Sequence, residues 1–166
     1  MDYRYYQRKI NDVIEKCPIE AGVEILVYTL LDQLIDSEKY SLVDINRIWK
    51  NQDTRLVTGA GIPDIAVLSK DFLFKNEDAG VVYGFIEVKA AGVGLRNTEQ
   101  ISGELSSINH FIYTNGIVWK YYENHEETWV VNLLVDERPY SEEKVEISKE
   151  KYDDLIEKIR QIGWCF

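Results

Sequence analysis

Cysteine and histidine are scarce in this 166-residue sequence, which contains two of each. Cys17 and Cys165 show neither the close paired spacing of a zinc site nor the density of a disulfide scaffold, so we expect free thiols in a reducing compartment. His110 and His125 form no metal-ligand motif and no H-N-H-like arrangement. These absences argue against a histidine-based nuclease or hydrolase.

Long hydrophobic runs are also missing. No apolar stretch approaches the roughly 20 residues that a membrane-spanning helix requires. The first residues, MDYRYYQRKINDVIEK, are charged and aromatic, whereas a secretion signal would be apolar. We therefore expect a cytoplasmic protein with no membrane partner.

Positive charge is in short supply, because 19 Lys and Arg stand against 29 Asp and Glu, for a net charge of -10. Such a balance is unfavourable for nucleic-acid binding, since phosphate contacts depend on Lys and Arg. The distribution is uneven: acidic residues concentrate after Asp136, whereas residues 47–75 are enriched in basic ones (Arg47, Lys50, Arg55, Lys70 and Lys75). We expect weak autonomous binding to nucleic acid, which a bound divalent cation would assist.

The spacing of apolar residues predicts four helices and at least five strands. Helices are predicted over Tyr3–Lys16, Ile19–Ile35, Asn97–Ser107 and Ser148–Ile162, the last with Ser148 as its N-cap. Strands are predicted over Ile62–Leu68, Val81–Lys89, His110–Thr114, Ile117–Tyr122 and Thr128–Val135, with Asn115-Gly116 as a tight primed turn. Residues 40–57 are ambiguous and compatible with a strand that ends in a charged loop.

The order of these elements predicts an α/β protein with a mixed central β-sheet flanked by helices. The hydrophobic fraction of 45% is sufficient for a substantial core. No repeat, low-complexity tract or linker interrupts the chain. We therefore expect residues 1–166 to form a single domain.

Three charged residues lie in otherwise apolar predicted strands, where burial is costly unless a cation or partner compensates the charge. Asp64 follows Gly61-Ile62-Pro63, and Glu87 and Lys89 lie in the segment Gly84–Ala90. Side chains alternate along a strand, so Glu87 and Lys89 project to the same side. If the two segments pair as a hairpin, Asp64 converges with them.

Two carboxylates beside an ammonium group favour divalent-metal chemistry on a phosphodiester, with the carboxylates holding the cation and the lysine orienting the attacking water. The alternative interpretation is structural: Asp64 caps a turn after Pro63, while Glu87 and Lys89 belong to a solvated charge ladder. The joint occurrence of the three residues, in this order and spacing, favours the nuclease site.

Pro63, Asp64, Glu87 and Lys89 together resemble the signature of the PD-(D/E)XK nuclease superfamily, the fold of restriction endonucleases. From about Glu20 to Tyr122 the chain is also similar to the nuclease domains of type I restriction subunits and of fused restriction-modification enzymes. The matching features are a helical glutamate, G-x-PD, E-V-K, a helix that begins near a glutamine, and T-N-G, here Glu20, Gly61–Asp64, Glu87–Lys89, Gln100 and Thr114–Gly116.

This resemblance implies that Asp64 and Glu87 bind Mg²⁺, for which Mn²⁺ could substitute, with the Val88 carbonyl completing the coordination. It also implies that Glu20 supplies a further carboxylate, with Glu24, one turn along, as the fallback. The alternative for both glutamates is a solvated helix face. Lys89 is implied to position the attacking water, so that cleavage leaves a 5'-phosphate.

The resemblance gives Gln100 a role in holding nucleic acid or orienting Lys89, although it could equally be an ordinary surface amide. Relatives often carry tyrosine four residues after this glutamine, and this chain has Glu104 instead. Arg96 could reach a phosphate or could be a solvated loop charge.

The function expected from the resemblance is a metal-dependent endonuclease acting on DNA, in restriction, defence or recombination, as a homodimer or with a partner protein that supplies recognition. RNA or a branched junction could also be the substrate. The competing hypothesis is a catalytically inactive nuclease-fold module for nucleic-acid or protein interaction, which the acidic composition favours.

Overall fold

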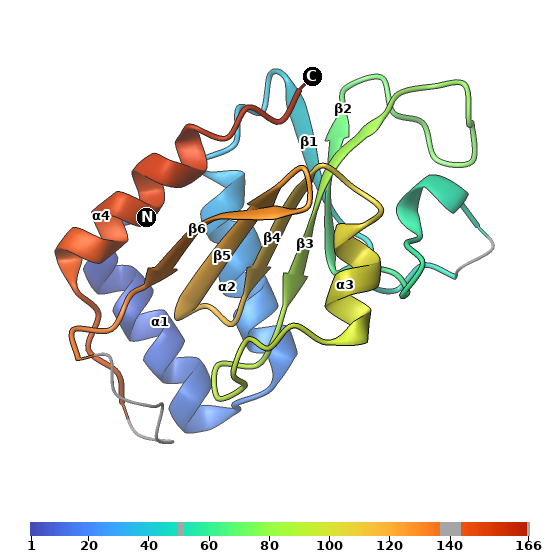
Figure 1. Ribbon diagram of the computed structural model, residues 1–166. Helices are drawn as coiled ribbons and strands as arrows, with labels where there is room; N and C mark the ends of the chain where they lie inside the picture. The colour runs from blue at the N-terminus through green and yellow to red at the C-terminus, as the bar shows by residue number, and fades with distance from the viewer. Residues whose placement is uncertain (50–51, 137–143, 166) are drawn as a thin grey trace.

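The computed structural model describes residues 1–49, 52–136 and 144–165 of the chain. A six-stranded sheet forms its centre, with the strands side by side in sequence order (Figure 1). The strands are β1 (Tyr40–Asp44), β2 (Ile65–Ser69), β3 (Val82–Val88), β4 (His110–Thr114), β5 (Val118–Glu123) and β6 (Glu126–Asn132). The helices are α1 (Tyr3–Lys16), α2 (Glu20–Asp32), α3 (Glu99–Leu105) and α4 (Lys149–Arg160), with a short 3-10 turn, η1, at Thr54–Leu56.

The sheet is mixed, as the order of elements predicts. β3 and β4 run parallel, and all other neighbouring strands run antiparallel. A parallel connection needs a crossover, and α3 lies in the one between β3 and β4. The predicted α/β class, with a mixed central sheet flanked by helices, is confirmed.

Alternation along the strands separates two cores. Ile65, Ile86 and Ile112 point to one face of the sheet and pack with apolar residues of α1, α2 and α4. Ala66 and Phe85 point to the other face, in a smaller cluster that includes a residue of α3. Figure 1 shows α3 on the opposite side of the sheet from α1 and α2. We call these the three-helix face and the α3 face.

The ends of the helices follow from local capping. Asp2 accepts a hydrogen bond from the Tyr5 amide at 2.9 Å at the start of α1. Ser148 caps α4 as predicted, by accepting a hydrogen bond from the Lys151 amide at 3.4 Å.

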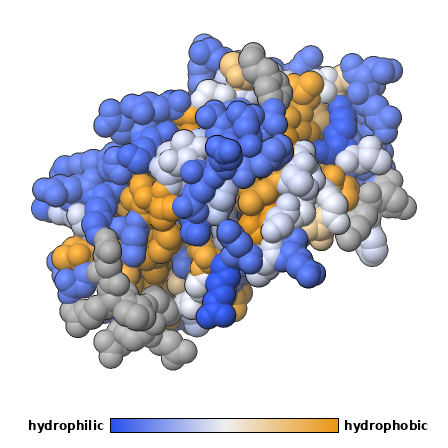
Figure 2. All heavy atoms as spheres, viewed as in Figure 1, coloured by the Kyte–Doolittle hydropathy of each residue, from blue (hydrophilic) through white to orange (hydrophobic). Residues whose placement is uncertain are grey.

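The described helices include none that is long and apolar enough to cross a bilayer. Polar residues dominate the molecular face in Figure 2, with apolar patches between them.

The ambiguous stretch 40–57 resolves into a strand followed by a turn and η1. β1 ends at Asp44, and the Ile45 amide then donates to the Asp64 carbonyl at 2.8 Å. Trp49 lies beyond the strand and is 74% exposed. Lys50, one of the basic residues noted in the sequence, lies outside the described residues.

The predicted primed turn at Asn115-Gly116 is wrong. Such turns need a positive φ at the first central residue, and here only Gly116 has one, of 79°. Asn115 instead accepts hydrogen bonds from the Ile117 and Val118 amides and so closes a longer connection. The two-residue turn lies between β5 and β6, where Asn124 and His125 have φ values of 50° and 72°.

Candidate active site

Asp64 and Glu87 are brought together by the pairing of β2 with β3. Ile65 pairs with Ile86, so the next step of the antiparallel register places Asp64 opposite Glu87, on the α3 face. The Asp64 carboxylate accepts a hydrogen bond from the Val88 amide at 2.7 Å. Both acids are buried, with relative exposures of 8% and 3%. The predicted hairpin therefore produces the predicted convergence.

Lys89 completes the cluster, one residue beyond the end of β3. Its Nζ lies 2.5 Å from Glu87 Oε1 and 3.9 Å from Glu20 Oε2. Glu20 is the first residue of α2, where the helix dipole favours a negative charge, and its side chain is 46% exposed. The structure thus places Glu20 at the open side of the cluster and the two strand acids at its buried side.

Burial and mutual repulsion shape the charge state of the cluster. Burial raises the pKa of Asp64 to about 7, and the Glu87 charge adds to the effect. Burial likewise raises the pKa of Glu87 to about 7, with the Glu104 charge adding to it and Lys89 opposing it. Burial is the largest single influence and disfavours the Lys89 ammonium, but the hydrogen bond with Glu87 and the charges of the neighbouring acids together outweigh it and raise the pKa of Lys89 above its usual value. Lys89 is therefore a cation in this arrangement.

Glu24 lies close to the cluster but is held by another partner. Asn46 Nδ2 donates to Glu24 Oε1 at 2.7 Å. Burial raises the pKa of Glu24 to about 7, and the charges of Asp64 and Asp44 contribute. Of the two helical glutamates, Glu20 is the one that lies beside Lys89.

The helix α3 brings two further polar side chains to the acids. Gln100 Nε2 donates to Glu87 Oε1 at 3.0 Å and to Glu104 Oε1 at 2.9 Å. Gln100 therefore contacts a strand acid directly, while the roles that the resemblance gave it, holding nucleic acid or orienting Lys89, stay predictions. Glu104, which entered the sequence argument only as a departure from a family pattern, is completely buried. Its position four residues from Gln100 was the available signal, because such residues share one side of a helix.

Close packing against Ala60 determines how near α3 lies to the segment that carries Asp64. A Cβ atom on Gly103 would lie 2.9 Å from the Cβ of Ala60, in the turn that leads into Pro63 and Asp64. Thr58 stabilises this turn by accepting a hydrogen bond from the Gly61 amide at 3.1 Å. The glycine at position 103 therefore allows α3 to sit directly against the segment that carries Asp64.

Two of the basic residues that cluster in the sequence, Lys70 and Arg55, do not lie beside these acids. Lys70 follows the end of β2 opposite to Asp64, so the length of the strand separates them, roughly 17 Å for five residues. Arg55 pairs with Asp53 at 2.8 Å and donates to the carbonyls of Ala79 and Leu73, which fastens the β2–β3 loop. Arg47 and Arg96 are exposed instead.

Arg47 and Arg96 follow strands whose last residues lie beside the acids. Arg47 follows β1, whose last residue, Asp44, pairs with Ile65 at the start of β2. Arg96 follows β3 in the connection to α3. These two arginines are therefore better placed than Lys70 to meet a ligand at the carboxylates.

The oxygen donors of the cluster meet part of the needs of a divalent cation. In the ranges that the structure describes, no three His, Cys, Asp or Glu side chains are arranged to hold a metal ion. Mg²⁺, however, is usually bound through one or two carboxylates, with waters and substrate phosphates completing its shell. Glu87 Oε2 is buried and has no hydrogen-bond partner among the described residues, while Oε1 accepts from Lys89 and Gln100. Asp64 and Glu87 therefore fit a Mg²⁺ site that the substrate completes.

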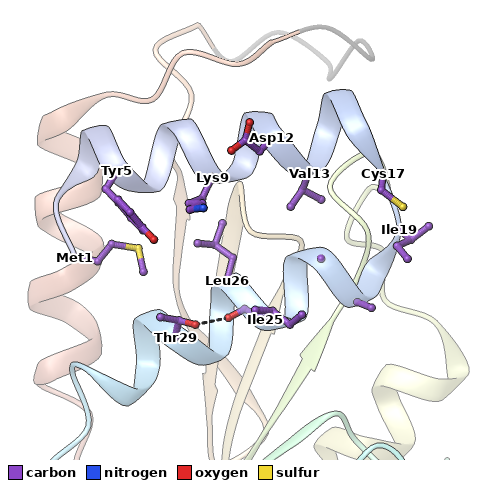
Figure 3. Close-up of a pocket in the computed structure, with 12 residues that line it drawn as sticks. Met1, Tyr5, Lys9, Asp12, Val13, Cys17, Ile19, Ile25, Leu26 and Thr29 are labelled. Atoms are coloured by element: carbon purple, nitrogen blue, oxygen red, sulfur yellow. Dashed lines mark hydrogen bonds between the residues drawn. The ribbon is translucent and has the colours of Figure 1, made fainter.

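An apolar groove on the surface lies away from these residues. A groove of about 560 Å³ runs between α1 and α2, with Val13, Ile25 and Leu26 in its apolar lining (Figure 3). Asp64, Glu87 and Lys89 do not line it. The candidate active site is the polar cluster on the α3 face, because it brings together Asp64, Glu87 and Lys89.

Comparison with known proteins shows a likeness in fold but none in sequence. No family model matches the sequence, and no curated protein does. The fold is similar to a chain in the cryo-EM structure of the DrdV–DNA complex, with a TM-score of 0.60, 16% identity, and coverage of 96% of this chain and 95% of that one. This likeness concerns the fold alone, which is an α/β fold consistent with a restriction-endonuclease-like core.

Proposed function

We propose that this chain is a metal-dependent endonuclease that hydrolyses DNA phosphodiester bonds with Mg²⁺, or with Mn²⁺ as a substitute. One observation carries the proposal: Asp64, Glu87 and Lys89 meet at the ends of two neighbouring strands, and one oxygen of the buried Glu87 is unpartnered. An unpaired buried carboxylate oxygen is costly, and a bound cation would remove that cost. The structural alternative, a solvated charge ladder, does not account for this burial.

Each residue has a distinct role in the proposal. Asp64 and Glu87 would hold the cation, and the Val88 carbonyl would add a ligand. Glu20 would contribute from the open side, with Glu24 as its fallback. A cation bound by these residues would polarise the scissile phosphate and lower the pKa of a bound water. Lys89, kept charged by the neighbouring acids, orients the water and stabilises negative charge that develops on the phosphate.

DNA is the proposed substrate because the fold is similar to that of a chain from a protein–DNA complex. Arg47 and Arg96 would contact phosphates beside the acids. The net charge of -10 limits the affinity of the chain alone, so a second copy or a partner protein would supply further contacts. The biological role that we propose for this nuclease is in restriction, defence or recombination.

The second candidate is an inactive module of the same fold that binds nucleic acid or protein. The net acidity favours it, as does the ion pair between Lys89 and Glu87, which neutralises part of the site without a metal. The two candidates differ in one property, since only the first requires Mg²⁺-dependent cleavage.

The experiment is a cleavage assay on plasmid, single-stranded DNA, a branched junction and RNA, each with Mg²⁺ or EDTA. We expect cleavage of DNA with Mg²⁺, none with EDTA, and a loss of at least about a thousandfold in Asp64→Asn and Lys89→Ala, since each removes a group acting on the reacting atoms. Lys70→Ala is the matched control, because it removes a lysine at the far end of β2. Absence of Mg²⁺-dependent cleavage on every substrate would leave the interaction module as the better description.

A further inference from the structure

Glu104 is a buried carboxylate that the proposed chemistry does not use. Its relative exposure is 0%, and its Oε2 has no hydrogen-bond partner among the described residues. Acidic residues are seldom fully buried without a partner, because desolvation of the charge is unfavourable. An apolar residue would fill this position in α3 at lower cost, so packing alone does not explain the glutamate.

Within the described part of the chain, the Glu104 side chain has one hydrogen bond, and it leads to the active site. Gln100 Nε2 donates to Glu104 Oε1 at 2.9 Å and to Glu87 Oε1 at 3.0 Å. An amide nitrogen carries two hydrogens and the amide oxygen carries none, so two carboxylate acceptors require the nitrogen to point at them. Glu104 thus selects the amide orientation that also serves Glu87.

The orientation of Gln100 determines how Glu87 presents its two oxygens. Oε1 accepts from both Lys89 and Gln100, whereas Oε2 is buried and unpartnered. Two donors on one oxygen restrict rotation of the carboxylate and leave the other oxygen for a cation. If the amide turned over, its oxygen would repel Glu87 and the carboxylate would be held by Lys89 alone.

We infer that Glu104 is a positioning residue, which fixes the Gln100 amide and through it holds Glu87 so that Oε2 stays available to a cation. This role rests on the proposed metal site but not on the identity of the substrate. It also separates Glu104 from Asp64 and Glu87, because Glu104 acts through another side chain rather than on the cation.

The test measures Mn²⁺ binding by titration calorimetry in the absence of DNA, with Glu104→Leu, Gln100→Leu and the double variant. We expect each single variant to lower Mn²⁺ affinity by about tenfold, as for other outer residues of metal sites. Because Glu104 acts on Glu87 through Gln100, the double variant should lose no more Mn²⁺ affinity than the single variant that binds Mn²⁺ more weakly. Glu104→Gln, which keeps an acceptor oxygen, should recover part of the affinity. Ser102→Ala, an exposed change in the same helix, is the control.

A merely structural role for Glu104 would give a different result. Unchanged Mn²⁺ affinity in both Glu104→Leu and Glu104→Gln would overturn the inference, and so would losses that multiply in the double variant. Absence of Mn²⁺ binding by the unmodified protein would also overturn it. Thermal unfolding of each variant identifies any that fail to fold. If Glu104→Leu fails to fold, the test uses Glu104→Gln, whose side chain has the same size and shape as glutamate.

The inference and the proposed function can fail separately. If the unmodified protein binds Mn²⁺, the variants behave as described, and no nucleic acid is cleaved, the nuclease proposal fails while the positioning role stands. If the protein cleaves DNA with Mg²⁺ and Glu104→Leu binds Mn²⁺ and cleaves like the unmodified protein, only the positioning role fails.

Discussion

The two faces of the sheet use the same strands for opposite purposes. On the three-helix face, Ile65, Ile86 and Val88 are completely buried among apolar residues of α1, α2 and α4. On the α3 face, the residues next to them in sequence include Asp64 and Glu87, which are nearly as buried but carry charge. One face therefore stabilises the fold through the hydrophobic effect, and the other holds a costly polar cluster that depends on the first.

The largest expected effect comes from the three-helix face. Leu30→Ala removes a fully buried side chain from α2 and should reduce the free energy of unfolding by about 2–5 kcal/mol. Chemical denaturation measures this change. Glu104→Leu on the α3 face should leave stability unchanged or raise it, because it replaces a buried charge. A large loss in Glu104→Leu would mean that the acids stabilise the fold and would remove the contrast between the faces.

Stability on the α3 face should depend on pH. The pKa of Glu87 in the folded protein, about 7, lies above its ordinary value of 4.5, so the folded state binds this proton more tightly than the unfolded chain. The resulting stability is fully present below about pH 4.5 and is lost as pH rises through 7. Glu87→Gln has no proton to lose at this position, so it should not show this loss of stability. Its Tm should therefore rise relative to that of the unmodified protein between pH 5 and 8, by roughly 3–6 °C for a difference of about 1–2 kcal/mol. A Tm difference that is constant over this range would contradict the assignment.

Divalent cations should reverse this pH effect. At pH 8, Mg²⁺ at a hundred times its Kd should stabilise the folded state by about 2.7 kcal/mol, which corresponds to a rise in Tm of roughly 5–10 °C. The rise should be smaller in Glu87→Gln and unaltered in Lys70→Ala. EDTA should abolish it. An equal rise in all three proteins would place the cation elsewhere.

The position of α3 can be tested without touching a charged residue. In Gly103→Val, the added side chain would collide with Ala60 and force α3 away from it. This shift should disturb the hydrogen bond from Gln100 to Glu87. We expect cleavage to fall by about tenfold to a hundredfold, as when a supporting contact is displaced by an ångström. Gly94→Ala, where a Cβ meets nothing within 4 Å, is the control.

The smallest expected effects concern the exposed arginines. Arg47→Ala and Arg96→Ala should each weaken DNA binding by a few-fold and reduce the slope of log affinity against log salt by about one. Fluorescence anisotropy at several salt concentrations measures both quantities, with Ca²⁺ in place of Mg²⁺ to prevent cleavage. Lys70→Ala should leave the slope unchanged, because Lys70 lies at the other end of β2.

The sequence determined most of the secondary structure, because apolar spacing and capping are local properties. The helix Tyr3–Lys16 matches its predicted bounds, and Ser148 caps α4 as expected. The convergence of Asp64, Glu87 and Lys89 was also predictable, since side-chain alternation and an antiparallel hairpin are sufficient to bring them together. The single-domain organisation and the metal site stay predictions.

Only the tertiary structure decided which other residues join these three. Arg55 and Lys70 are close to Asp64 along the chain, yet strand direction and the Asp53 ion pair take them away from it. Glu104 is distant in sequence from Asp64, yet the crossover between parallel strands returns α3 to the same face and buries it there. Local patterns specify the elements, whereas the surroundings of a charge depend on contacts between segments that no local pattern records.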